Sequence, residues 1–194
     1  MTKQVNQGVR PVHYRIGIEP DFSRFDFTGT ARIQLHADKT IKDVSLNILD
    51  LAIRRCACLQ KGDLADCPFH INPEEERLTI FLPMPMEGEI NLAIDYYGEI
   101  NQSMAGFYRS QYKKEGKTHP IAVTQFQESD ARRAFPCMDH PIYKATFEVT
   151  LVTEPHLSVV SNTPVQEQTF METGKQRTTF TRTPKMSTYL LFFG

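Results

Sequence analysis

The chain has 194 residues, of which 40% are hydrophobic and 23% are charged, and its formal net charge at pH 7 is -1. This length allows one substantial core or at most two small ones, and the composition is ordinary for a soluble globular domain. Because neither sign of charge dominates, we expect no nucleic-acid partner and no anionic membrane partner. No apolar run approaches the roughly 18 residues that a membrane span requires.

The two ends of the chain suggest where the protein acts and how much of it is present. The opening segment, MTKQVNQGVRPVHY, lacks the apolar region of a signal peptide. If Met1 is the true start, we expect a cytoplasmic protein whose four cysteines are reduced. The final segment, MSTYLLFFG, is expected to be an apolar strand, and an unprotected strand at the end of a chain indicates a cut domain.

Apolar and polar residues alternate along most of the chain, as in half-buried strands. In VHYRIGIEP (12–20), Tyr14, Ile16 and Ile18 share one face. One buried and one solvated face is typical of antiparallel sheets. Further strands are expected at FTGTARIQLHA (27–37), DVSLNI (43–48), EINLAIDYY (89–97), ATFEVTLV (145–152), LSVVSN (157–162), TTFTR (178–182) and TYLLFFG (188–194).

Turn signals separate these segments, and helical periodicity is almost absent. The best helix candidate is 128–134, at most two turns long, where Ser129 and Asp130 offer polar groups to the first turn. We therefore expect an all-β domain over 1–194, with two or more packed sheets and at most one short helix. The turn signals are EPDFSRFD (19–26), KGD (61–63), NPEE (72–75), PMPMEG (83–88), KKEGK (113–117) and METGK (171–175).

Several kinds of active site are not encoded in this sequence. Cys56, Cys58, Cys67 and His70 superficially suggest zinc, but structural zinc sites use C-x-x-C knuckles. On a strand, Cys56 and Cys58 would lie about 6.6 Å apart along its axis, so buried thiols are the favoured interpretation. The HExxH and G-x-S-x-G motifs and a Gly-rich phosphate loop are absent. We find no complete catalytic set.

The stretch TQFQESDARRAFPCMDHP (124–141) concentrates the polar chemistry of the chain. Gln125 and Gln127 are two residues apart, so on extended backbone their amides project to one face and could clamp a peptide backbone. Pro136 and Pro141 fix the intervening CMDH as rigid, non-helical chain. The pattern alone is compatible both with a functional site and with an ordinary polar turn.

Read with its flanks, this stretch resembles the aminopeptidase N family of zinc metallopeptidases, the gluzincin exopeptidases. The amino-terminal β domain of that family carries a segment close to T-Q-F-E-P-T-D-A-R-R-A-F-P-C-F-D-E-P. PVHYRIGIEPDFSRFDFTGTARI, GFYRS, KATFEVTL, VSNTPV and MSTYLLFFG also resemble the family, so the likeness covers essentially the whole chain. The matching positions of the central segment are Thr124, Gln125, Phe126, Asp130, Ala131, Arg132, Arg133, Ala134, Phe135, Pro136, Cys137, Asp139 and Pro141.

The resemblance implies a saddle-shaped, multi-sheet antiparallel β domain that packs on a thermolysin-like catalytic domain in the complete enzyme. The exopeptidase motif G-A-M-E-N and the zinc helix of the family lie downstream and are absent here. Zinc would therefore be the cofactor of the full-length parent and would not be bound by this chain. The parent would remove N-terminal residues from peptides, and this chain alone is expected to be inactive.

The resemblance also implies roles for individual residues. Gln125 would contact the substrate backbone, and Gln127 occupies a position, often Glu in the family, that binds the α-ammonium of the substrate. An amide there weakens a charge-assisted bond worth about 1.5–3 kcal/mol, although some members, including the bifunctional leukotriene-epoxide branch, also carry Gln. Glu128, Met138 and His140 are further departures from the family pattern. The residues expected to support the site structurally are Asp130, Arg132, Arg133 and Asp139.

Two other readings remain open. A non-catalytic scaffold or interaction protein could retain the aminopeptidase fold, which the amide at Gln127 mildly favours and the retained Gln125 disfavours. An independent β-sandwich binding module would explain the fold but not the series of motifs.

Overall fold

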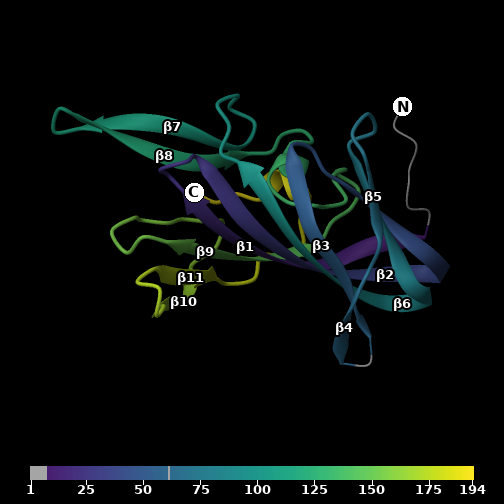
Figure 1. The fold of residues 1–194 in the computed structure, drawn as a ribbon. Helices are drawn as coiled ribbons and strands as arrows, with labels where there is room; N and C mark the ends of the chain where they lie inside the picture. Colours follow the sequence, from purple (N-terminus) through teal and green to yellow (C-terminus); the bar gives the residue numbers. More distant parts are fainter. Residues whose placement is uncertain (1–7, 61) are drawn as a thin grey trace.

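The structure is a computed structural model that describes residues 8–60 and 62–194 (Figure 1). Over these ranges the chain forms strands and two three-residue 3-10 turns, η1 (Ala131–Arg133) and η2 (Thr188–Leu190), with no α-helix. The expectation of an all-β domain is confirmed. The strands are β1 (Val9–Asp21), β2 (Asp26–Asn47), β3 (Leu51–Gln60), β4 (Asp63–Asp66), β5 (Phe69–Asn72), β6 (Arg77–Glu99), β7 (Gly106–Lys114), β8 (Lys117–Gln125), β9 (Thr146–Thr153), β10 (Val165–Phe170) and β11 (Gln176–Phe180).

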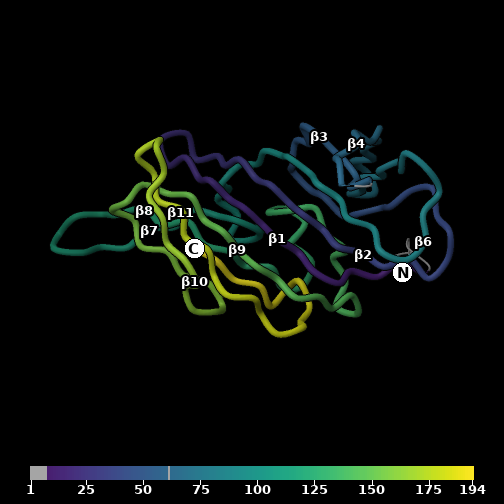
Figure 2. Tube along the Cα trace, turned by 90° about the horizontal axis from the view of Figure 1, so that it is seen from below, coloured from purple at the N-terminus to yellow at the C-terminus, as the bar shows by residue number. Residues whose placement is uncertain are grey.

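Two sheets of very different size organise the domain. The large sheet has the order β10-β11-β9-β1-β2-β6-β3-β4, with β5 also paired to β6, and the small sheet is the β7–β8 hairpin. All neighbours pair antiparallel except β1 and β9, which run parallel from His13↔Thr146 to Ile18↔Leu151. The large sheet is strongly twisted along its length, with β10–β11 and β3–β4 at opposite ends (Figures 1 and 2).

The expected inward faces form the core. Tyr14, Ile16 and Ile18 of β1 are each at most 1% exposed, as are the matching apolar positions of β2. The ring of Tyr14 stacks on Phe147 of β9 with a centroid distance of 5.1 Å and meets Phe135 edge-on at 6.0 Å. Phe135 lies two residues after the end of η1, so the aromatic core links the large sheet to the 124–141 stretch.

Four expectations about individual segments are wrong. The helix expected at 128–134 is only the 3-10 turn η1, and the strand expected at 188–194 begins with the 3-10 turn η2. Residues 157–162 form no strand, but Ser161 bridges Phe193. PMPMEG (83–88) lies inside β6 instead of forming a turn.

The two prolines of that segment explain how it fits into a strand. The pairing of β6 with β2 jumps from Phe81 to Met86, so residues 82–85 have no partner on β2. Proline lacks the N–H that a ladder needs, and Pro83 and Pro85 fall within this gap. In the described part of the chain, no helix is long and apolar enough to cross a membrane.

Candidate functional site

Gln125 and Gln127 lie where the β7–β8 hairpin joins the body of the domain. Gln125 is the last residue of β8 and pairs with Gly106 at the start of β7. Both glutamines are exposed, whereas Phe126 between them is 1% exposed. Phe126 packs edge-on against the rings of Phe135 and Phe193, at centroid distances of 5.9 and 6.0 Å. The buried ring anchors the segment and leaves the two amides in solvent.

The residue before the pair is tied to the C-terminal segment. The backbone N–H and the hydroxyl of Thr124 both donate to the carbonyl oxygen of Phe193, each at 3.1 Å. The N–H of Phe193 donates back to Oγ1 of Thr124 at 3.0 Å. This reciprocal set fixes the end of β8 against a part of the chain that is remote in sequence.

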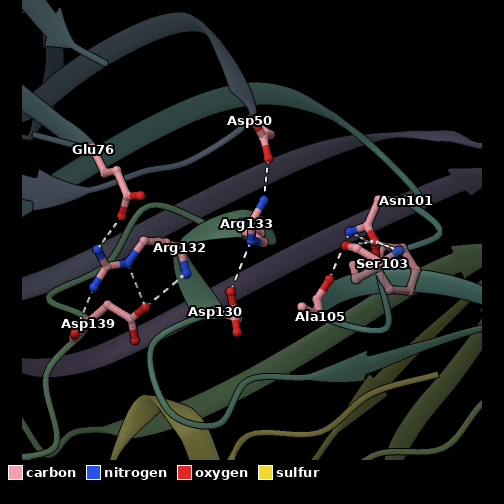
Figure 3. Close-up of polar contacts among 10 residues, drawn as sticks. Asp50, Glu76, Asn101, Ser103, Ala105, Asp130, Arg132, Arg133 and Asp139 are labelled. Carbon is pink, nitrogen blue, oxygen red and sulfur yellow. Dashed lines mark hydrogen bonds and ion pairs between the residues drawn. The ribbon is translucent and has the colours of Figure 1, made fainter. Parts of the chain in front are cut away.

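Gly106 lets β7 approach the arginine pair closely. Its backbone has φ +72°, and a Cβ at this position would lie 2.5 Å from Cβ of Arg133. A side chain is therefore excluded both by the left-handed backbone and by contact. Asn101 holds the loop leading into Gly106, donating from Nδ2 to the carbonyl oxygens of Ala105 and Phe107 at 2.8 and 3.0 Å (Figure 3).

Behind the glutamines, Arg132 and Asp139 form a buried ion pair. The side chain of Arg132 is 14% exposed and that of Asp139 is 0% exposed. Oδ2 of Asp139 accepts from Nε of Arg132 at 3.1 Å and from the Arg132 backbone N–H at 3.2 Å. Oε2 of Glu76 accepts a hydrogen bond from Nη1 of Arg132 at 2.6 Å, as Figure 3 shows. Burial acts to lower the pKa of Arg132, but Asp139 and Glu76 raise it overall, so the guanidinium stays charged.

The second oxygen of Asp139 connects this pair to other parts of the fold. Oδ1 accepts the hydroxyl proton of Thr188 in η2 at 2.7 Å. The backbone N–H of Asp139 donates to Oδ1 of Asn47, the last residue of β2, at 3.0 Å. Asn47 also exchanges backbone hydrogen bonds with Cys137 at 2.7 and 3.2 Å. The carboxylate of Asp139 thus joins η1 to η2, and its backbone N–H ties both to the end of β2.

Arg133 has separate partners, nearer the surface. Its Nε donates to Oδ1 of Asp130 at 2.9 Å, and its Nη1 pairs with Asp50 (Figure 3). Both arginines of the DARR segment are therefore paired with carboxylates of this chain. Asp50, Asn47, Glu76 and Thr188 were not identified from the sequence, because they lie far from the stretch along the chain and carry no local pattern.

The other residues singled out by sequence behave differently. Cys56, Cys58 and Cys67 are free, buried thiols at the β3–β4 end of the large sheet, and burial raises the pKa of Cys56 to about 12. Within residues 8–60 and 62–194, no group of three or more His, Cys, Asp or Glu side chains could hold a metal ion. His140 is exposed, and its Nδ1 accepts the backbone N–H of Ile142 at 3.3 Å.

This arrangement is suited to binding. Two exposed amides at a strand end offer donors and acceptors to an extended polypeptide, and a buried, fully hydrogen-bonded scaffold holds the backbone that carries them.

Comparison with known proteins points to one kind of protein. The family model described as Peptidase M1 N-terminal domain matches residues 10–190. The chain is 40% identical over 193 residues to Aminopeptidase 2, mitochondrial, of Saccharomyces cerevisiae, covering 95% of this chain and 20% of that protein. It is 39% identical to Puromycin-sensitive aminopeptidase of Caenorhabditis elegans, and the match covers 94% of this chain and 20% of that protein. It is 34% identical to human Endoplasmic reticulum aminopeptidase 1, and the match covers 95% of this chain and 20% of that protein. The chain thus spans about a fifth of the length of these relatives.

Proposed function

Because the chain belongs to the Peptidase M1 N-terminal domain family, we propose that its parent is a zinc aminopeptidase to which this domain contributes one wall of the substrate cleft. In this proposal Gln125 binds the backbone of a peptide near its N-terminal residue, and Gln127 faces the α-ammonium group. The observation that carries the proposal is the exposure of both amides on a segment anchored by buried Phe126. The relatives supply its chemistry, since their names describe aminopeptidases.

We assign the zinc ion to the part of the parent outside this domain. The described residues contain no cluster of ligands that fits a zinc ion, which supports this assignment. The chain is then inactive by itself, and its contribution to the reaction is to position the substrate. Asp130, Arg132, Arg133 and Asp139 are proposed to keep the glutamine-bearing segment in place through the ion pairs described above.

An exposed apolar strip beside the glutamines supports packing on a thermolysin-like catalytic domain. Leu190 and Phe192 are 48% and 36% exposed, while Leu191 and Phe193 between and after them are buried. Val160, 55% exposed, lies next to this segment, because its N–H donates to the carbonyl oxygen of Gly194 at 2.9 Å. Contiguous exposed apolar surface of this kind marks interaction sites.

The test uses the full-length parent with an aminoacyl reporter substrate. Removing a neutral hydrogen bond in Gln125→Ala should raise KM about 2- to 10-fold, whereas Gln166→Ala, an exposed glutamine on β10, should leave it unchanged. Gln127→Glu should lower KM by about 10-fold or more, because it restores a charge-assisted bond to the ammonium. If Gln125→Ala behaves like Gln166→Ala, the assignment of the site is wrong.

The second candidate is a scaffold that has lost its metal, and the amide of Gln127 is the observation that favours it. A parent that contains no zinc and hydrolyses no aminoacyl reporter would establish this alternative. We propose a cytoplasmic location for the parent, and the four free, buried cysteines support it. The names of two relatives place them in mitochondria and in the endoplasmic reticulum, so fractionation of the tagged parent is the measurement that decides.

A further inference from the structure

The β7–β8 hairpin extends away from the rest of the domain (Figures 1 and 2). Among the residues that the structure describes, these two strands form a sheet of their own. Its register is unbroken from Gly106↔Gln125 at the base to Lys114↔Lys117 at the tip. The two halves of this hairpin have very different surroundings.

The inner half is packed into the core, and the outer half is not. Phe107 near the base is 3% exposed and contacts the rings of Phe27 and Phe193, each at a centroid distance of 5.3 Å. Residues 110–118, which form the outer half and the turn, are all exposed. An isolated two-stranded hairpin is at best marginally stable in water, so an uncovered half of this length indicates a surface that is covered in the complete protein.

The exposed half is basic and carries an aromatic pair. Residues 110–119 contain three lysines, at positions 113, 114 and 117, and a single acidic residue, Glu115. This segment is therefore basic in a chain whose net charge is -1. None of the side-chain ammonium groups of these lysines forms an ion pair or hydrogen bond with any other residue that the structure describes. Tyr112, 48% exposed, stacks on His119 at 5.3 Å with an interplanar angle of 24°. Cationic groups around an exposed ring suit an acidic protein surface.

We propose that residues 110–119, the hairpin arm, dock on an acidic surface of the parent's own polypeptide outside this domain. This inference rests on the proposed function, because it requires that the parent continue beyond the domain. The choice of occupant follows from length: the chain spans about a fifth of its relatives, so most of the parent is available to cover the arm. The same ladder that carries the arm ends at Gln125, so one continuous hairpin joins the arm to the segment that bears the glutamines.

The test measures the accessibility of lysines in the full-length parent. Lys113, Lys114 and Lys117 should be acetylated at least about threefold more slowly than Lys39 and Lys42, because ion pairing withdraws an amine from the reagent. Lys39 and Lys42 are exposed lysines of β2 and serve as internal controls. The difference should shrink in about 1 M NaCl, where charge attraction is screened. Equal rates for the two groups of lysines would overturn the proposal.

A zero-length carbodiimide cross-link identifies the occupant. The expected products join lysines of the arm to Asp or Glu residues of the same polypeptide beyond position 194. Products that join the arm to a second copy, or to another protein, would overturn the proposal. The Lys113→Glu/Lys114→Glu/Lys117→Glu variant should abolish these products, whereas Lys39→Glu/Lys42→Glu should retain them. The readouts separate the two claims: a parent without peptidase activity that still shows these cross-links refutes only the proposed function, and an active parent with an unprotected arm refutes only this inference.

Discussion

Replacing Asp139 tests whether the buried ion pair holds the candidate site in place. Its carboxylate is fully buried and accepts three hydrogen bonds, two from Arg132 and one from Thr188. In Asp139→Ala, the guanidinium of Arg132, 14% exposed, would keep only Glu76 as an acidic partner. Removing one member of a buried ion pair costs about 3–5 kcal/mol, a large part of the roughly 5–15 kcal/mol that stabilises a domain.

The assay is urea unfolding of the chain followed by far-ultraviolet circular dichroism, since the chain has no tryptophan. Asp66→Ala is the matched control, because Asp66 also accepts from an arginine Nε, that of Arg55, at 2.7 Å, but its side chain is 74% exposed. The control should leave the unfolding free energy nearly unchanged, because solvent screens an exposed pair. A loss below about 1 kcal/mol in Asp139→Ala would refute the reasoning, as would additive losses in the Arg132→Ala/Asp139→Ala double variant.

Four further predictions concern other buried groups. Burial lowers the pKa of His13 from its usual 6.5, so the unfolded chain binds this proton more tightly than the folded chain. The stability contributed by neutral His13 is therefore complete above about pH 6.5 and is lost as the pH falls below it. In His13→Gln, the urea concentration at the unfolding midpoint should therefore change less with pH between about pH 7.5 and 5.5 than in the unmodified chain. The Tyr96 hydroxyl is buried with no hydrogen-bond partner among the described residues, so Tyr96→Phe should be neutral or stabilising. Tyr14→Phe should cost about 1 kcal/mol in the same assay, because the Tyr14 hydroxyl accepts a buried backbone N–H at 3.2 Å. Burial raises the pKa of Cys56 to about 12 and that of Cys67 to about 11; a colorimetric thiol reagent at about pH 8 should therefore label them only as fast as the protein unfolds.

Alternation of residue types predicted the parts of the fold that have one buried face. In β9 every second residue is buried, so its period is visible in the sequence. By contrast, all six residues of β10 are exposed, and no apolar pattern marks it as a strand. The outer half of β7 was missed for the same reason. Pairing with a neighbour, and not burial, makes these segments strands.

The candidate site was predictable only where its chemistry is local. The spacing of Gln125 and Gln127 predicted that both amides lie on one side of an extended segment, and the structure shows both residues exposed with buried Phe126 between them. The partners that hold this segment come from far away in sequence: Asn47 lies 92 residues before Asp139, and Thr188 lies 49 residues after it. No single-sequence pattern encodes contacts over such separations, because they depend on how the sheets are assembled.

The parallel pairing of β1 with β9 has a consequence for how the protein is made. His13 contacts Thr146, 133 residues later, and Thr124 is tied to Phe193, 69 residues later. Contacts of such long range form slowly, since a large loop must close before they contribute. During synthesis on the ribosome, the edge of β1 that pairs with β9 stays unpaired until β9 emerges. Thr124 likewise has no partner until Phe193 emerges. Synthesis therefore supplies Gln125 and Gln127 long before it supplies Phe193, which fixes the neighbouring Thr124. The domain completes its fold only after its last residues leave the exit tunnel.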